Sequence, residues 1–258
     1  MRWAVVVAAV AVSVPELAAA SERLFAYAYE SAVLGPGQVE LEPWTTVRAG
    51  RSEFYRRFDE RLEFEFGLAP RLQTSLYLNA SAKASGLAGA RENEFEFEGV
   101  SSEWKLKLSD PVAHVLGSAL YLEGTLSPLE AELEAKVILD KRNGDFVAAL
   151  NLVGEFEWSL EGPQMEQAIT VEAVLGLGYQ ITSAWSVGVE ARSVNLLGEK
   201  GSSALYLGPT VAYASQKWWA ALSLQPQVAA LHGASAGSTL DLDHNERVQG
   251  RLLLGFHL

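Results

Sequence analysis

The chain has 258 residues, of which 49% are hydrophobic and 20% are charged, and its formal net charge is −12. This acidic balance argues against binding to nucleic acid, because neutralising phosphates requires a basic face. The sequence contains no cysteine, which excludes disulfide bonds, thiol chemistry and cysteine-ligated zinc.

The first 20 residues predict a secretory signal peptide. Arg2 precedes an apolar run over residues 3–14, and small residues occupy positions 18–20. We expect cleavage near Ala20. The apolar run is too short to span a bilayer as a helix, and no later stretch approaches the roughly 20 apolar residues that such a helix requires. A protein built of membrane-spanning helices is therefore excluded.

From residue 38 onward, apolar and polar side chains alternate with a period of two, which predicts β-strands. In VSSEWKLKL, at residues 100–108, charged side chains alternate with large apolar ones. Most predicted strands exceed the soluble mode of about 5 or 6 residues and reach the roughly 9 to 11 that cross a bilayer. Twelve strands are predicted, at residues 38–49, 58–68, 72–83, 100–108, 115–126, 131–140, 146–158, 167–179, 185–195, 204–214, 218–228 and 245–258.

The connections between these strands alternate in length. Bacterial outer-membrane barrels join their strands by short periplasmic turns and longer external loops, with both termini in the periplasm. The short connections are residues 69–71, 109–114, 141–145, 180–184 and 215–217, and the longer ones are 84–94, 159–166, 196–203 and 229–244. Two further connections, 50–53 and 127–130, are short where this rule expects longer loops.

An outer-membrane barrel turns its apolar side chains toward lipid and its polar ones toward the lumen. A midplane Arg or Lys that faced hydrocarbon would cost about 2 to 4 kcal/mol, so the alternating charges predict an enclosed polar lumen. The charged residues assigned to this lumen are Arg61, Glu63, Glu65, Glu103, Lys105, Lys107, Glu123, Glu132, Glu134, Lys136, Glu155, Glu172, Glu190, Arg192, Arg247 and Arg251.

The predicted fold class is all-β, a single antiparallel transmembrane β-barrel of about 12 strands with a polar lumen and periplasmic termini. Residues 1–20 form the signal peptide and residues 38–258 the barrel. Residues 21–37 form an N-terminal periplasmic segment, which either stays in the periplasm or tucks into the barrel mouth. Tryptophans near strand ends, Trp44 and Trp219 among them, predict anchors in the headgroup layer.

Catalysis and metal binding have little support in the sequence. Ser, Asp and Gly are common in turns, and DLDHNE lacks the glycine and the twelve-residue spacing of an EF-hand. No enzyme activity, cofactor or metal site is predicted. The last predicted loop nevertheless groups candidates for a nucleophile, an imidazole and a carboxylate: His232, Ser235, Ser238, Asp241, Asp243 and His244.

The segments GPGQVELEPWTT, FEGVSSEWKLKLSDPV, ALYLEGTL, ELEAKVILDKR and LGPTVAY resemble a group of proteobacterial outer-membrane proteins described as transporters. Some members of that group carry a phenol meta-pathway label. The resemblance covers most of the chain after the signal peptide and implies an outer-membrane barrel. Its motifs are strand and turn signatures, so it assigns no functional residue.

The expected function is the passage of small solutes through a narrow charged lumen in the bacterial outer membrane. The alternative is a structural barrel, with a lumen closed by salt bridges and with loops that bind partners. A soluble lipocalin-like barrel is the remaining fold alternative. The expected partners are outer-membrane lipids, the barrel-assembly machinery that reads the apolar closing strand, and a small solute of unknown identity, without nucleic acid.

Overall fold

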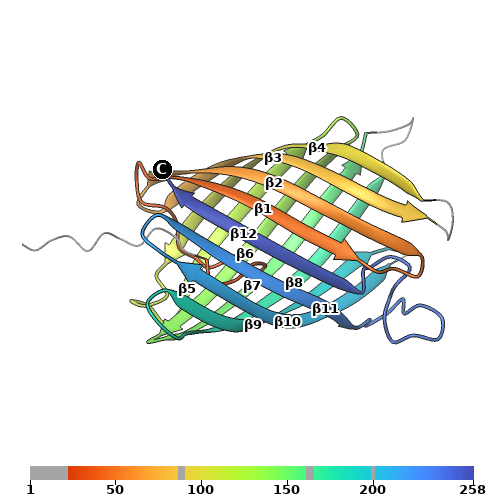
Figure 1. The fold of residues 1–258 in the computed structure, drawn as a ribbon. Helices are drawn as coiled ribbons and strands as arrows, with labels where there is room; N and C mark the ends of the chain where they lie inside the picture. Colours follow the sequence, from red (N-terminus) through yellow and green to blue (C-terminus); the bar gives the residue numbers. More distant parts are fainter. Residues whose placement is uncertain (1–22, 87–90, 161–165, 199–200) are drawn as a thin grey trace, which may run out of the picture.

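The computed structural model describes residues 23–86, 91–160, 166–198 and 201–258. These residues form a closed antiparallel barrel in which each strand pairs with the next and β1 pairs with β12 (Figure 1). The strands are β1 (Val39–Ala49), β2 (Phe54–Ala69), β3 (Leu72–Gly86), β4 (Glu92–Ser109), β5 (Gly117–Leu126), β6 (Glu130–Asn143), β7 (Phe146–Ser159), β8 (Gln167–Gln180), β9 (Trp185–Leu197), β10 (Ser202–Ala214), β11 (Trp218–Ala229) and β12 (Val248–His257).

The period-two pattern of the sequence becomes an inner and an outer surface of the barrel. Directly opposed residues of antiparallel strands share a face, so Glu42 opposes Glu63 while Leu41 opposes Phe64. The Glu63 residue is 1% exposed and Lys105 is 5% exposed, whereas Leu106 is 42% exposed. An apolar outer surface of this kind belongs in hydrocarbon, and the predicted twelve-stranded barrel with a polar lumen is confirmed.

No helix among the described residues has the length and hydropathy needed to cross a bilayer. The predicted signal peptide over residues 1–20 lies outside the described residues.

Strand β4 begins eight residues earlier than predicted, at Glu92 instead of residue 100, because a bulge hides its first part from the pattern. The pairing of β3 with β4 shifts register between Asn79 and Ala80. Gly99, at the bulge, has φ +102°, and a side chain there would meet the backbone of Leu126. The extra residue exchanges the inner and outer positions of the strand, so a single alternation cannot extend across it.

The two ends of the barrel differ, and we call the end where β1 begins and β12 ends the proximal end. Figure 1 shows the C-terminus at this end. Tight connections join the strands here, residues 70–71 between β2 and β3 and residues 144–145 between β6 and β7. The longest connection, residues 230–247, lies at the opposite, distal end.

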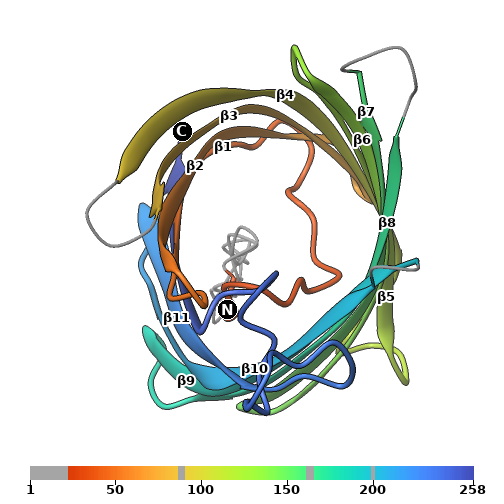
Figure 2. The same cartoon turned by 90° about the vertical axis from the view of Figure 1, so that its right-hand side faces the viewer.

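Residues 23–38, which we call the luminal segment, run through the barrel interior, as Figure 2 shows in a view along the barrel axis, and reach β1 through an exposed turn at residues 36–37. The segment has no regular secondary structure, yet Phe25 and Ala26 are fully buried and Tyr27 is 4% exposed. The described part of the segment therefore occupies the barrel interior. Burial of its aromatic side chains provides the physical reason.

Candidate functional site

The luminal segment is held in the barrel through its backbone. The amide N–H groups of Ala26, Tyr27 and Ala28 donate to the carboxylate of Glu190 on β9, at 3.3, 2.8 and 2.8 Å. Glu190 itself is fully buried. Because an irregular segment lacks a strand partner, its buried N–H groups require acceptors of this kind.

Other anchors for the segment come from widely separated strands of the wall. Asn151 on β7 binds Tyr29 in both directions, accepting from its N–H at 2.6 Å and donating to its carbonyl at 2.9 Å. The N–H of Leu34 donates to Gln73 on β3 at 2.9 Å. The segment is thus attached on several sides of the lumen.

Strand β8 contributes a notch for the ring of Phe25. Gly176 and Gly178 both lie beneath this ring, and a Cβ atom built on them would come within 2.9 Å and 3.1 Å of it. Real Cβ atoms do not approach a neighbour as closely as the first of these distances. The inward glycines of the sequence LGLG therefore provide space that a side chain would take.

Each of the two tyrosines of the segment has cationic side chains stacked on its ring. Tyr27 lies against Arg251 and Arg192, whose guanidinium carbons are 4.2 and 4.6 Å from the ring centre. Tyr29 lies against Lys136 and Arg23, each 4.0 Å from the ring centre. Cation–π contacts of this type gain strength as water is excluded. The segment, its own Arg23 and three barrel cations thus pack together across the lumen at this level.

Above this floor lies a cavity of about 510 Å³, which we call the vestibule. Tyr27, Tyr29 and Trp44 line it together with charged residues from two sides. Strands β1 and β7 are half a turn apart in the closed order, so the two sides face each other. The basic wall, on β12, β1 and β2, contains Arg48, Arg57, Arg61 and Arg251, and the acidic wall, on β6 to β8, contains Glu130, Glu132, Glu134, Glu155, Glu157 and Glu172.

The basic wall is largely neutralised by nearby carboxylates. Arg48 and Arg57 both bind Asp59, at 2.7 and 2.5 Å, and Arg61 forms an ion pair with Glu123. Asp59 lies with Arg48 and Arg57 on β1 and β2, whereas Glu123 reaches Arg61 from β5, so three of the four arginines have a carboxylate partner.

Fewer residues of the acidic wall form ion pairs. Glu134 binds Lys136 at 2.8 Å, and Glu172 lies 3.6 Å from Arg192. Within the part of the chain that the structure describes, Glu132, Glu155 and Glu157 have no basic group within 4.0 Å. One side of the vestibule is therefore lined by carboxyl groups that have no basic partner among the described residues.

The sixteen residues that the sequence assigned to the lumen occupy three places in the structure. Eight line the vestibule: Arg61, Glu132, Glu134, Lys136, Glu155, Glu172, Arg192 and Arg251. Six are buried in the wall or against the luminal segment: Glu63, Glu65, Glu103, Lys105, Glu123 and Glu190. The last two are not brought together with them, since Lys107 binds Asp110 beside a proximal turn and Arg247 precedes β12, which begins three residues later than predicted.

Two tryptophans expected in the headgroup layer point inward instead. Trp44 is 2% exposed and its Nε1 donates to Glu42 at 3.2 Å, and Trp219 is fully buried and donates to Glu40. The alternation could have revealed the first of these, because Trp44 shares its face with Glu40 and Glu42. Proximity to a strand end does not by itself decide which way a tryptophan points.

The sequence pattern did not identify Tyr27 and Tyr29, which line the vestibule, as functional residues. Tyr27 and Tyr29 belong to AYAYES, where aromatic residues alternate with alanine, but the segment has no strand neighbour that would place it. Asn151, which holds Tyr29, also carries no charge that would mark it as unusual. Their proximity is a tertiary feature.

The polar residues of the last loop have structural partners. Ser235 accepts the N–H of Leu242 at 2.8 Å, and the buried Asp241 accepts the N–H groups of Asp243 and His244 at 3.3 and 3.2 Å. A hydrogen bond from Ser52 lowers the pKa of Asp243 below its usual value. These contacts close the turns of the loop, as the sequence interpretation expected.

The sequence profile of a family of unknown function (DUF6662) matches residues 17–132 and 129–258. A comparison with curated proteins finds no match.

Solved structures with a similar fold include an outer-membrane channel, porins and autotransporter domains. The COG4313 outer membrane channel from Pseudomonas putida F1 has a TM-score of 0.60 and 11% identity, covering 88% of this chain and 97% of that one. The NanC porin has a TM-score of 0.53 and 12% identity, with 84% and 100% coverage. The KdgM porin has a TM-score of 0.50 and 9% identity, with 84% and 98% coverage. At such identities the likeness concerns the fold.

Proposed function

We infer the function from two premises: the chain belongs to DUF6662, a family of unknown function, and its fold is that of bacterial outer-membrane barrels. We propose that it is a channel for small polar solutes, with the luminal segment as its gate. The proximal end then faces the periplasm, and the vestibule opens toward the cell exterior.

The vestibule is the observation that carries this proposal. A barrel with only a structural role has no need of a cavity of about 510 Å³ lined by opposed basic and acidic residues. Its uncompensated carboxylates favour the entry of cations and of polar neutral solutes over anions. The preferred solute class is therefore small, polar and without net negative charge.

The luminal segment supports a gated passage. Its floor of Tyr27 and Tyr29 lies directly beneath the vestibule, so a solute that continues through the barrel has to displace it. The segment is attached by side-chain hydrogen bonds and is not a strand of the sheet. It can therefore move without breaking the barrel.

A specific observation favours the structural alternative. Below the floor, the lumen contains buried charges, including Glu103 and Lys105 at 1% and 5% exposure. A permanently closed barrel with partner-binding loops would have such an interior.

Single-channel recording in planar bilayers separates the two functions. The full chain after signal removal, refolded in a neutral detergent, is expected to give discrete conductance steps and a reversal potential that favours cations. A silent protein with an intact barrel, across a range of salt concentrations and voltages, would reject the channel and support the structural alternative.

The proposed partners follow from the two surfaces of the barrel. Outer-membrane lipids contact the apolar exterior, and the barrel-assembly machinery reads β12, which exposes Leu252 and Phe256 at 38% each. Catalysis is not proposed, because the candidate residues of the last loop have roles in its turns.

A further inference from the structure

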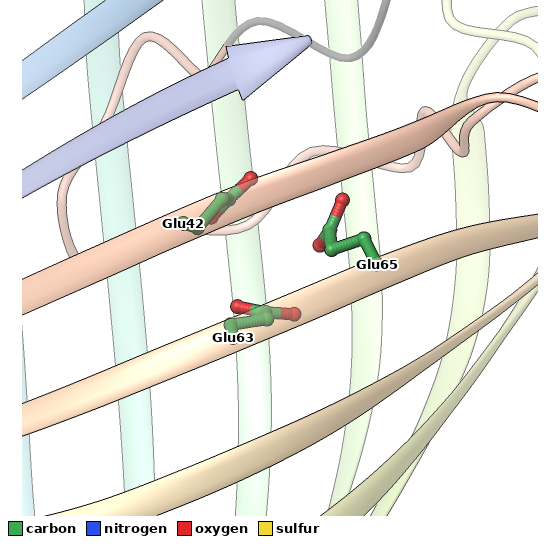
Figure 3. A group of neighbouring side chains, drawn as sticks. All are labelled: Glu42, Glu63 and Glu65. Atoms are coloured by element: carbon green, nitrogen blue, oxygen red, sulfur yellow. The ribbon is translucent and has the colours of Figure 1, made fainter. Parts of the chain in front are cut away.

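Three carboxylates gather inside the proximal half of the barrel, and we call them the carboxylate trio. Glu42 on β1 and Glu63 and Glu65 on β2 each bring an oxygen atom within 4.8 Å of the others (Figure 3). Their exposed fractions are 1%, 1% and 8%. Glu42 and Glu63 are direct partners in the β1–β2 register, so the sheet itself fixes two of the three side chains next to each other.

The trio has no internal counter-ion at contact distance. No Lys, Arg or His nitrogen of the described residues lies within 4.0 Å of these three carboxylates. Glu42 accepts one hydrogen bond, from the indole of Trp44 at 3.2 Å. Buried carboxylates so close together cannot all stay ionised on their own, so they have to take up protons or share a cation.

Glu63 provides a second observation that points to a ligand. Both of its carboxylate oxygens are buried, and neither receives a hydrogen bond from the described residues. Other carboxylates in this lumen bind a partner, as Glu190 binds three backbone N–H groups and Glu40 binds His257 at 2.7 Å. A carboxylate that is buried and unbonded on both oxygens needs a partner, and a metal ion supplies one.

We propose that the trio is a calcium site of this protein, in which Glu42, Glu63 and Glu65 each supply one oxygen. Ca²⁺ accepts oxygen ligands at roughly 2.3 to 2.6 Å, so any two oxygen ligands of one ion lie within about 5 Å of each other, as the oxygens of the trio do. Mg²⁺ usually keeps several waters and binds through one or two carboxylates, so a set of three carboxylates suits Ca²⁺ better. Trp44 orients the Glu42 carboxylate by its hydrogen bond.

The site is also linked to the luminal segment. The guanidinium of Arg23 interacts electrostatically with all three carboxylates while it stacks 4.0 Å from the centre of the Tyr29 ring. Arg23 and a bound ion therefore compete for the same negative charge. Calcium at the trio weakens the attachment of the Arg23 end of the segment, and loss of Arg23 strengthens calcium binding.

Isothermal titration of the full refolded chain, freed of lipopolysaccharide and stripped of metal, tests the site with CaCl₂ as the probe. We expect one saturable Ca²⁺ per chain. Glu63→Gln keeps the volume of the side chain and removes its charge, and it should weaken binding at least about tenfold. Arg23→Gln should change affinity in the opposite direction, with severalfold tighter binding.

The matched control is Glu157→Gln, which removes a luminal carboxylate from the acidic wall of the vestibule, outside the trio. It should retain the calcium affinity of the unmodified protein. Heat-modifiable migration on a gel verifies that each variant is a folded barrel, and Glu65→Gln replaces Glu63→Gln if the latter does not fold.

The absence of saturable binding in the unmodified protein would overturn the proposal. So would equal loss of affinity in Glu63→Gln and Glu157→Gln, because calcium would then merely screen the lumen. Binding does not depend on conductance, so a silent channel that still binds calcium would reject the transport function and leave the metal site in place.

Discussion

The distal and proximal halves of the lumen are built by the same strands and differ in what fills them. In the distal half, charged side chains line a vestibule of about 510 Å³. In the proximal half, comparable side chains are buried, as Glu63 and Glu103 are at 1% exposure each. The luminal segment makes this difference, since it places Phe25, Tyr27 and Tyr29 across the barrel. The barrel wall therefore determines the polarity of the lumen, whereas the luminal segment determines which half of the lumen is filled.

Removal of residues 24–34 should have the largest effect of the changes considered, because it takes most of the luminal segment out of the barrel. The proximal half would then lack the segment, as the distal half does. We expect conductance to rise severalfold over that of the full chain, since the floor of the vestibule is lost. Planar-bilayer recording measures the change. An unaltered conductance, in protein that migrates as a folded barrel, would show that the segment does not limit passage.

Glu190→Ala should release the middle of the segment. Three buried N–H groups lose their acceptor, and each unsatisfied donor costs about 1 to 3 kcal/mol. Cleavage of the segment by an added protease should become much faster, with the barrel itself resistant. Glu172→Ala is the control, because it removes a carboxylate from β8 that receives no N–H from the segment among the described contacts. Equal cleavage of the two variants would contradict the role of Glu190.

Gly176→Ala tests the notch for Phe25. The added Cβ would stand 2.9 Å from the ring, so the ring has to shift, and we expect a loss of about 1 to 3 kcal/mol in the free energy of unfolding. Gly124→Ala on β5 is the matched control, since its Cβ meets nothing within 4 Å. Urea unfolding in lipid vesicles compares the two. A Gly176→Ala variant as stable as its control would mean that the ring is not confined.

Glu132→Gln combined with Glu155→Gln should alter the distal half alone. These carboxylates line the vestibule without a nearby base, so their neutralisation should reduce cation preference and leave the luminal segment attached. The reversal potential in a salt gradient measures this preference. Loss of conductance without a change of selectivity would point instead to a structural effect.

Asp110 should give the smallest effect, at a proximal turn outside both halves. Hydrogen bonds from Lys107 and from the backbone N–H groups of Ala113 and Val112 lower its pKa below the usual value for aspartate. Because the pKa of Asp110 is lowered in the folded protein, its ionised form stabilises the turn at pH values above the usual pKa of aspartate. This stability is lost as the pH falls through the lowered pKa. Asp110→Asn should therefore reduce the difference in stability between neutral and acidic pH, measured by urea unfolding. An identical pH profile in both proteins would refute this.

Alternation in the sequence was sufficient to predict the barrel, its twelve strands and the inward side of Glu63 and Lys105. It predicted them because a strand has only two faces and a bilayer penalises charge on one of them. The same rule failed at the start of β4, where the bulge at Gly99 exchanges the inner and outer faces. For Trp44, the prediction of a headgroup anchor was wrong, although the alternation places this residue on the polar face with Glu40 and Glu42.

Only the tertiary structure decided where residues 23–38 lie, how they pack across the lumen and that Glu42, Glu63 and Glu65 converge. An irregular segment has no period to read, and its place depends on acceptors from β9, β7 and β3, such as Glu190, Asn151 and Gln73, that lie far from it in the sequence. Which carboxylates meet likewise depends on the register of β1 against β2, which brings Glu42 beside Glu63. The local pattern determines which way a side chain points, and long-range packing determines what it meets there.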